Sequence, residues 1–251
     1  MFVRLTLTKP TSKPISSSIL KCFFTTRRRR QHVNPFSGRY AVLTPSSDSL
    51  QWIANKGKAN KETTFHLDLG CGSGTYLSNL AVERPTINYV GVEIKEQLVD
   101  IANKRHAQLL PNLLFIWANL LNPQTLSSLL NSFPAGQLQS ISILHPDPNY
   151  KNRHMKRDYV TKDFLSTLGN HLLPGARVYI QTDVEEVDTK FKEVFDSLLV
   201  QQQMFEEVNL KEVEMLVEEG KNGSLLGVPT DREKSVLKAG GVLYRRTYVK
   251  C

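Results

Sequence analysis

From Phe65 onward, short apolar runs alternate with longer segments in which apolar residues recur every three or four positions. Apolar runs of about 4–8 residues predict buried strands, and a period near 3.6 residues predicts amphipathic helices. The alternation continues to residue 200 and indicates an α/β domain, a mainly parallel sheet with helices on both faces. The predicted strands are 65–69, 89–93, 113–117, 139–144 and 175–181, and the predicted helices are 74–83, 95–109, 123–132, 158–170 and 185–200.

The two ends of the chain do not follow this alternation. Residues 31–64 show little periodicity, which predicts a lead-in arm with one short helical piece at 50–54. After residue 200 two more strands are expected, with helices and a loop between them, and we expect them to add a terminal hairpin-like pair to the parallel sheet. The segments expected there are a strand at 205–210, an acidic helix at 211–219, a loop, a helix at 230–239 and a last strand at 241–250.

A glycine-rich turn lies in the stretch FHLDLGCGSGTYL, residues 65–77. A buried strand carrying Asp68 gives way to Gly70, Gly72 and Gly74 and then to a helix start. Glycine permits a sharp bend and close approach of a ligand to the backbone, and a helix N-terminus offers free N–H groups. The stretch therefore predicts a nucleotide-cofactor turn, although a purely structural turn has the same composition. Its spacing differs from G-x-G-x-x-G, which argues against a dinucleotide.

Polar residues follow the other predicted strands as well. Glu93 ends the second strand, where a Rossmann-like sheet places the carboxylate that accepts hydrogen bonds from a ribose diol. Asn119 and Asp147 follow the third and fourth strands. Because parallel strands end at the same edge of a sheet, we expect these residues to share a ligand site with Gly70. The glycine turn and Glu93 together resemble the S-adenosylmethionine site of Rossmann-like methyltransferases.

The net charge of +8 belongs mainly to the N-terminus. Residues 1–47 hold nine Lys or Arg and no Asp or Glu, which leaves 23 basic and 24 acidic side chains in the remaining 204 residues. Residues 1–30 are also rich in Ser and Thr and lack the long apolar core of a secretory signal. That composition predicts an organellar transit peptide, for a mitochondrion or a chloroplast, with a basic RNA-binding tail as the alternative.

The cysteines and the apolar runs indicate the redox compartment of the protein and whether it binds a metal or a membrane. Cys22, Cys71 and Cys251 are widely spaced and match no metal or redox pattern, which favours a reduced compartment and no metal site. No apolar run approaches the ~20 residues of a membrane span, so we expect no membrane partner. A chain of 251 residues is long enough for one α/β domain with extensions.

The loop LHPDPNYKNRHMKRDYV, residues 144–160, follows the fourth strand. Pro146 and Pro148 stiffen the backbone around Asp147, which we expect beside the reactive end of the cofactor. A solvated basic loop is one interpretation of the residues that follow. The predicted methyl donor nearby favours the other, a phosphate-binding edge. The cationic or potentially cationic residues of this loop are Lys151, Arg153, His154, Lys156 and Arg157.

The run P-D-P-x-x-K-x-R-H-x-K-R at 146–157 resembles the signature of the tRNA (guanine-N7-)-methyltransferase family. Two other segments are similar to that family, TDVEE at 182–186 and PTDREK at 229–234. In order and spacing the resemblance covers residues 65–250. Three positions depart from the family pattern: the usual aromatic is Asn149, the usual second Arg of K-R-R is Asp158, and the usual Asp is Asn119.

This resemblance implies a Rossmann-like class I methyltransferase fold, a mainly parallel seven-stranded sheet with an antiparallel terminal strand. It implies methyl transfer from S-adenosylmethionine to N7 of a guanosine in the variable loop of tRNA. The implied cofactor-binding residues are Asp68, Gly70, Gly72, Gly74, Glu93, Ile94, Asn119 and Leu120. Asp147 is the implied catalytic residue, and the implied substrate-binding residues are Asp147, Lys151, Arg153, His154, Lys156, Arg157, Asp183, Thr230 and Glu233.

The chemistry of guanine agrees with this residue set. N7 has an in-plane lone pair and no proton to lose, so transfer requires alignment and charge stabilisation more than a strong base. Asp147 can orient the base and offset the positive charge that grows on it. Glu233 suits the Watson–Crick edge, since one carboxylate can accept from both N1–H and N2–H. The structural alternative is a capping box formed by Thr230 and Glu233.

Other functions stay open at this point. The segment Asp147-Pro148-Asn149-Tyr150 is close to the D-P-P-Y loops that methylate exocyclic or amide nitrogens, although its second Pro is missing. A non-catalytic RNA-binding module that retains the fold is a further alternative. We predict a transit peptide at 1–30, an arm at 31–64 and the methyltransferase domain at 65–251, in a monomer or homodimer.

Overall fold

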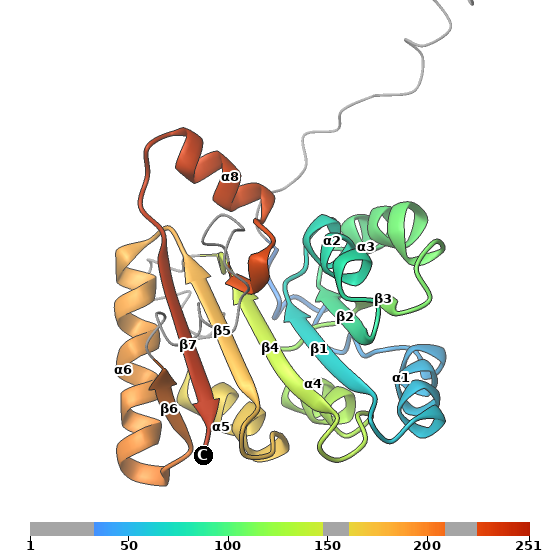
Figure 1. The fold of residues 1–251 in the computed structure, drawn as a ribbon, viewed down its shortest axis with the longest axis horizontal. Helices are drawn as coiled ribbons and strands as arrows, with labels where there is room; N and C mark the ends of the chain where they lie inside the picture. Colours follow the sequence, from blue (N-terminus) through green and yellow to red (C-terminus); the bar gives the residue numbers. More distant parts are fainter. Residues whose placement is uncertain (1–32, 148–160, 209–224) are drawn as a thin grey trace, which may run out of the picture. The chain divides into compact units, whose positions relative to one another are not determined.

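The computed structural model describes residues 33–147, 161–208 and 225–251. Within these ranges seven strands form one sheet in the order β3-β2-β1-β4-β5-β7-β6 (Figure 1). Strands β1 to β5 run parallel, and β7 is antiparallel to both β5 and β6. The predicted sheet, mainly parallel with an antiparallel end, is therefore confirmed. The strands are β1 Thr64–Leu69, β2 Ile87–Glu93, β3 Leu113–Trp117, β4 Leu138–Leu144, β5 Arg177–Thr182, β6 Phe205–Val208 and β7 Tyr244–Lys250.

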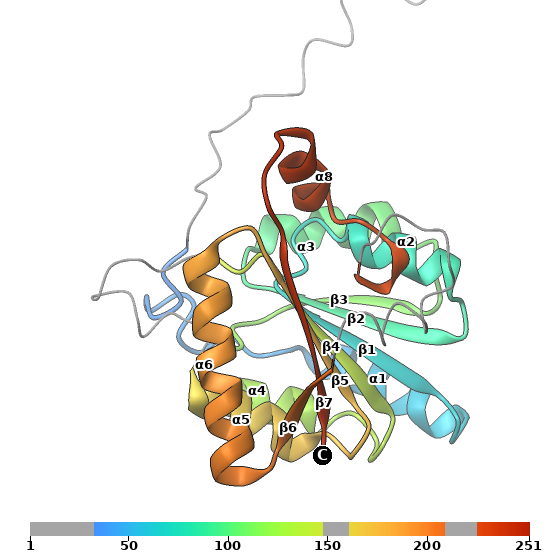
Figure 2. The same ribbon diagram turned by 60° about the vertical axis from the view of Figure 1, so that its left-hand side comes forward.

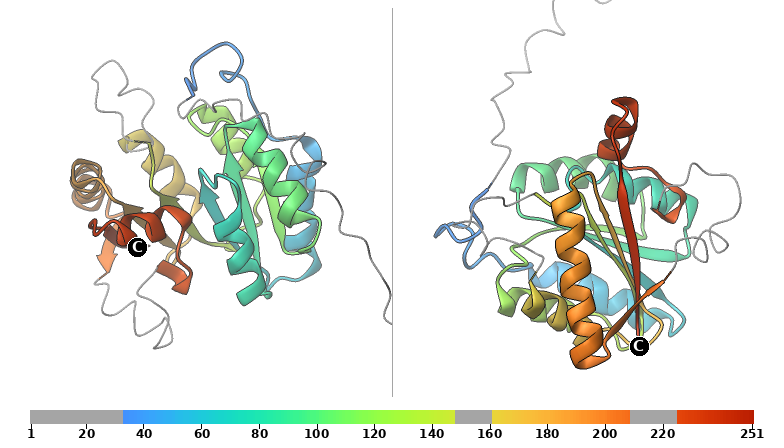
Figure 3. Two further views of the ribbon diagram at one scale, coloured as in Figure 1. Left: turned by 90° about the horizontal axis from the view of Figure 1, so that it is seen from above. Right: turned by 90° about the vertical axis from the view of Figure 1, so that its left-hand side faces the viewer.

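Helices pack on both faces of this sheet (Figures 2 and 3). Helices α1, α4, α5 and α6 contribute to one hydrophobic cluster with the strands, and α2 and α3 contribute to a second. Helix α8 stands beyond the carboxyl ends of the strands (Figure 1). The helices are α1 Ser47–Ala59, α2 Thr75–Glu83, α3 Glu96–Ala102, α4 Pro123–Leu130, α5 Lys162–His171, α6 Glu185–Gln202 and α8 Asp231–Lys238.

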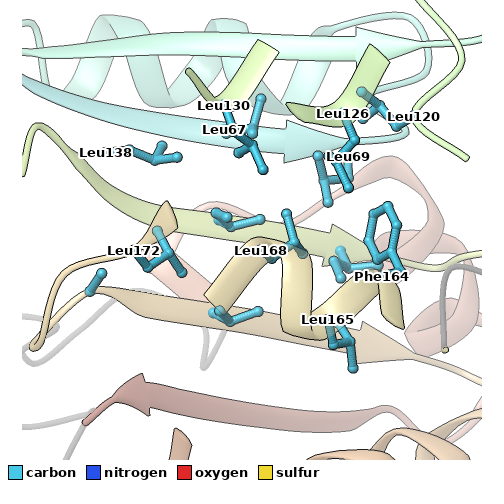
Figure 4. Close-up of a cluster of buried hydrophobic side chains, with 14 of the residues drawn as sticks. Leu67, Leu69, Leu120, Leu126, Leu130, Leu138, Phe164, Leu165, Leu168 and Leu172 are labelled. Carbon is cyan, nitrogen blue, oxygen red and sulfur yellow. The ribbon is translucent and has the colours of Figure 1, made fainter. Parts of the chain in front are cut away.

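Strand β1 shows how alternation sorts residues between the two faces. Leu67 and Leu69 enter the first hydrophobic cluster, while successive side chains of a strand point to opposite faces, which sends His66 and Asp68 the other way. Burying each such leucine contributes about 1.5–3 kcal/mol. The helix residues that pack around β1 and β4 in Figure 4 include Leu126, Leu130, Leu165 and Leu168. This packing keeps the carboxyl ends of β1 and β4 at one edge of the sheet.

The segment before β1 is more regular than predicted. Instead of a short helical piece at 50–54, α1 extends over thirteen residues, Ser47–Ala59. Ser46 caps it by accepting a hydrogen bond from the Ser49 N–H, and Ile53 is fully buried against the sheet. Only one side of α1 is apolar, and its lysines obscured that period in the sequence. The boundaries predicted at 30/31 and 64/65 stay predictions.

The helix predicted at 95–109 was wrong in its second half. The α-helix ends at Ala102 and a π-helical turn, Asn103–Ala107, follows it. None of the residues of this turn is buried, so core packing does not impose an α-helical period there.

The C-terminal part follows the prediction where it is described. Strand β6 is described as far as Val208, and the last two residues expected in it, 209 and 210, lie outside the described part of the chain. Helix α8 starts at Asp231 with Thr230 as its N-cap, as predicted, and β7 starts at Tyr244, three residues later than expected. The helix predicted at 211–219 lies outside the described residues. In the described ranges, no helix combines the length and apolarity needed to cross a membrane.

Candidate active site

The glycine turn between β1 and α2 leaves open space in front of its backbone. Gly70, Gly72 and Gly74 all have positive φ, of +87°, +58° and +79°. A Cβ atom built on Gly70 or Gly72 would meet nothing within 4 Å. On Gly74 it would come within 2.4 Å of the Phe115 ring, so this third glycine serves packing. The first two glycines therefore fit a turn that a cofactor approaches closely.

Glu93 lies directly beside this turn. The N–H of Gly72 donates to Glu93 Oε2 over 3.2 Å, and the N–H of Lys95 donates to Oε1 over 2.9 Å. Burial raises the pKa of Glu93, while these backbone hydrogen bonds work in the opposite direction. The carboxylate thus has a fixed orientation at the carboxyl end of β2, where a ribose diol could donate to it. Ile94, next in the chain, accepts from Trp117 Nε1 through its carbonyl at 3.0 Å.

Asp68 is the end of a buried polar chain that crosses from β4 to β1. Ser142 Oγ donates to Asp68 Oδ1 over 2.5 Å, and Ser142 Oγ lies 2.9 Å from Nε2 of His66. The other ring nitrogen of His66 lies 2.8 Å from Ser140 Oγ. Burial raises the pKa of Asp68 to about 7; the Ser142 hydroxyl lowers it and the Glu93 charge raises it further. The sequence predicted Asp68 but not its contact with Ser142, which lies on a different strand.

We expect Asp68→Asn to gain stability relative to the wild type as the pH rises. An unfolded Asp titrates near 3.8 and the folded group near 7, so between these values the folded state binds more protons. The contribution of Asp68 to the free energy of unfolding therefore falls as the pH rises, by about 1.4 kcal/mol per pH unit, whereas Asn does not titrate. Urea unfolding of both proteins at mildly acidic and mildly alkaline pH measures this. An offset between them that is the same at both pH values would contradict the prediction, and Asp163→Asn on α5, at an exposed residue, is the control.

Asn119 connects the end of β3 to the segment that precedes α1. Its side-chain amide donates to the carbonyls of Pro35 and Tyr40 over 2.9 and 3.1 Å, and its Oδ1 accepts from the Leu121 N–H. The side chain is almost fully buried. The structure thus places Asn119 at the expected edge with hydrogen bonds to this segment, and its contact with a cofactor stays a prediction. The Leu120 side chain lies in the hydrophobic cluster, so the backbone is the part of this residue that a ligand could reach.

Asp147 follows β4 and is exposed at the same edge. Strand β4 lies next to β1, so Asp147 and the glycine turn follow neighbouring parallel strands. The predicted basic residues of the next segment lie outside the described residues: Lys151, Arg153, His154, Lys156 and Arg157.

Thr230 and Glu233 form the capping box of α8. Thr230 Oγ1 accepts from the Glu233 N–H over 3.0 Å, and Glu233 Oε2 accepts from the Thr230 N–H over 3.3 Å. Glu233 is 1% exposed, and it also accepts from Arg245 Nη2 over 2.7 Å and from Gln181 Nε2 over 3.2 Å. The structural alternative is therefore observed. Guanine binding by Glu233 stays a prediction, and it would compete with these donors of the protein.

Asp183 follows β5 and completes the set of described site residues. Its carboxylate accepts from Arg232 Nε and Nη2 and lies 3.1 Å from Nδ1 of His145. Burial alone would raise the pKa of Asp183, but the hydrogen bonds from Arg232 and His145 outweigh it and lower that pKa. Four further residues of the site were not predicted: His145, Gln181, Arg232 and Arg245. Three of them had a local signal, since His145 directly precedes the P-D-P run, Gln181 precedes Thr182-Asp183, and Arg232 lies within PTDREK.

The described residues contain no cluster of three or more His, Cys, Asp or Glu side chains that could hold a metal ion. What they bring to one edge of the sheet is the open glycine turn, an oriented carboxylate at Glu93 and an exposed carboxylate at Asp147.

Comparison with known proteins gives the family of this chain. Residues 62–246 match a family model described as "Putative methyltransferase". The tRNA (guanine-N(7)-)-methyltransferase of Nostoc sp. is 35% identical over 88% of this chain and 93% of its own length. The enzymes of the same name from Synechococcus elongatus and Microcystis aeruginosa are 36% and 34% identical, over 89% and 88% of this chain and 96% and 97% of their own lengths. Among solved structures, the aminoglycoside resistance methyltransferase NpmB1 aligns with a TM-score of 0.49 at 15% identity, over 82% of this chain and 94% of that chain. The chain belongs to the tRNA (guanine-N(7)-)-methyltransferase family.

Proposed function

We propose that this protein transfers a methyl group from S-adenosylmethionine to N7 of a guanosine in tRNA. Relatives that match most of the chain carry this activity in their names. One structural observation supports it most strongly: the open glycine turn, Glu93 and Asp147 follow adjacent parallel strands β1, β2 and β4 and lie at one edge of the sheet.

Each of these groups has a distinct task in the proposed reaction. S-adenosylmethionine, when bound, supplies an electrophilic methyl group on its sulfonium. Gly70 and Gly72 leave room for it because neither carries a side chain into the open space before the turn. Glu93, already oriented by two backbone N–H groups, accepts hydrogen bonds from the ribose hydroxyls. Asp68 lies at the end of β1, below the same turn.

Asp147 acts on the base. Guanine N7 attacks with its lone pair and needs no proton removed, so the chain has to align the base and balance the positive charge that it gains. An exposed carboxylate at the end of β4 can do both. The basic residues of 151–157 bind tRNA phosphates in this proposal, and the guanosine is the one in the variable loop.

The direct test is to incubate the purified protein with labelled S-adenosylmethionine and bulk tRNA, and to map the modified nucleoside. The proposal predicts 7-methylguanosine at a single variable-loop position. Label on an exocyclic or amide nitrogen would support the D-P-P-Y alternative instead. Binding of tRNA without transfer of label, in a protein that binds S-adenosylmethionine, would support an RNA-binding module. Light scattering during size exclusion distinguishes the expected monomer or homodimer.

We also propose that residues 1–30 direct the protein to a mitochondrion or a chloroplast. The amino-acid composition of this segment supports the proposal, because it is rich in Arg, Ser and Thr and contains no Asp or Glu. A fluorescent fusion of residues 1–30 should enter one of these organelles, and a protein that starts at residue 31 should retain tRNA methylation. Cytosolic fluorescence would contradict the first expectation, and lost methylation would contradict the second.

A further inference from the structure

His145 holds an unusual backbone conformation directly before the Pro146-Asp147 segment. Its φ is +50°, in the left-handed region that costs an ordinary residue about 1–2 kcal/mol. His145 lies one residue beyond the end of β4, and its N–H donates to the carbonyl of Gln181 on β5 over 2.6 Å. Such conformations persist where surrounding contacts determine them, and they gather at functional sites. The contacts of the His145 side chain therefore bear on how Asp147 is placed.

The imidazole of His145 bridges two residues of β5 and the loop after it. Nε2 lies 2.9 Å from Nε2 of Gln181, and Nδ1 lies 3.1 Å from Oδ1 of Asp183. The Gln181 amide is oriented by its other partners, because Arg245 Nε can only donate and it contacts Gln181 Oε1 at 2.8 Å. The amide NH₂ of Gln181 must then face His145, so the ring accepts at Nε2 and donates from Nδ1. Only the neutral ring satisfies both contacts.

Helix α8 is tied to the same imidazole through two further contacts. Arg232 donates to both oxygens of the Asp183 carboxylate, and His145 Nδ1 contacts Oδ1 of the same carboxylate. Glu233 accepts from the same Gln181 amide that donates to His145. One buried ring thus connects the end of β4, the end of β5 and the start of α8. The side chain of His145 is only 10% exposed, so water does not readily replace these contacts.

We propose that His145 is a positioning residue for methyl transfer, whose neutral imidazole fixes the backbone that carries Asp147 relative to Asp183 and α8. This inference rests on the proposed function, because it concerns the residue that acts on guanine. When His145 gains a second proton, Nε2 becomes a donor that faces the donor amide of Gln181. Gln181 cannot turn its amide around without directing its NH₂ at Arg245 Nε, so the bond is lost and the segment before Asp147 loosens.

The charges that face the ring decide where this protonation falls. They are the carboxylates of Asp183 and Glu233 and the guanidinium of Arg232, with Arg245 behind Gln181. Burial lowers the pKa of His145 below its usual value, and the Asp183 carboxylate offsets only part of this. The ring is therefore neutral at neutral pH, and we expect the methylation rate to fall in the acid range as it charges.

The test compares single-turnover methylation by the wild type, His145→Ala and His145→Asn, with saturating tRNA and S-adenosylmethionine, from about pH 5 to about pH 8. His145→Ala should lower the rate by about tenfold or more at neutral pH, because a misplaced reacting group alone can cost about 100-fold. His145→Asn should recover part of it, since Asn tolerates a positive φ and can donate to Asp183. Both variants should lack the part of the acid limb that depends on His145, and the KM for tRNA should change little. His171→Ala, at the C-terminal end of α5, is the matched control and should keep the wild-type rate and profile.

A second readout does not depend on methylation. Nitrogen-15 spectra of the histidine side chains should show His145, assigned by its loss in His145→Asn, as the neutral ring protonated on Nδ1 at neutral pH. A charged ring, or a proton on Nε2, would overturn the inference. So would an active wild type whose rate and acid limb are unchanged in His145→Ala. A wild type that methylates no guanine while the ring shows the expected tautomer would refute the proposed function instead.

Discussion

Gly72→Val should abolish S-adenosylmethionine binding and leave a folded domain. Gly72 has a φ of +58° and faces space in which a Cβ would meet nothing within 4 Å, so the valine side chain would occupy the approach to the turn. Its neighbour Glu93 would lose the orientation that the Gly72 N–H provides. Calorimetric titration of S-adenosylmethionine measures the binding, and circular dichroism reports the fold.

Valine at a positive φ is strained whatever surrounds it, so this prediction needs a control with the same strain. Gly175 has a φ of +89° and open space before it, and it lies two residues before the start of β5, at the opposite end of that strand from Asp183. Gly175→Val should therefore carry a similar cost of about 1–2 kcal/mol and bind the cofactor normally. If folded Gly72→Val keeps undiminished affinity, the glycine turn is not the cofactor site.

Asp147→Ala should cut the single-turnover rate by about 100-fold to 1000-fold, the range seen when one stabilising group is removed from a reacting centre. Its contact with the base strengthens as positive charge develops, so the affinity for tRNA should hardly change. Asp147→Asn keeps the shape and loses the charge, and it should be nearly as slow if charge stabilisation dominates. Asp163→Ala, at another exposed carboxylate, is the control for a general change of surface charge.

Substitutions of the basic residues after Asp147 should affect tRNA binding and not the rate of methyl transfer. Arg153→Ala or Lys156→Ala should weaken tRNA binding and flatten its salt dependence, since each lost phosphate contact removes about one released counterion from the slope. The near balance of charge outside residues 1–47 makes this segment one of the few sources of such attraction. Salt titrations of tRNA affinity decide the matter. Equal salt slopes for all variants, with Asp147→Ala as the weaker binder, would reverse the assignment.

Much of the sheet could be predicted because its signals are local. Leu67 and Leu69 alternate with His66 and Asp68 in a period that only a strand buries correctly, and the turn that follows needs glycine at positive φ. The capping box of Thr230 and Glu233 spans three residues and is likewise readable. Helix α1 was underestimated, because one buried face among lysines gives a weak period.

The polar contacts of the candidate site could not be predicted from the sequence, because they join residues that are far apart in the chain. Asn119 holds carbonyls that precede it by 84 and 79 residues, and Gln181 joins His145, 36 residues before it, to Arg245, 64 residues after it. A periodic pattern assigns a side chain to a face of its own strand. It does not say which strand lies alongside, and β7 reaches Gln181 only because it inserts antiparallel between β5 and β6.

Glu233 has one contact that the local sequence specifies and two that depend on the tertiary structure. Its bond to the Thr230 N–H depends on helix geometry three residues away, so the chain specifies it locally. Its bonds to Arg245 and Gln181 depend on the order β5-β7 in the sheet. Burying that carboxylate without them would cost several kcal/mol, so the packed sheet determines which donors Glu233 contacts. The sequence alone is enough to infer the class of reaction, since the glycine turn and the P-D-P run are each a continuous segment of the chain. The arrangement of donors around His145 exists only once three strands and a helix have packed.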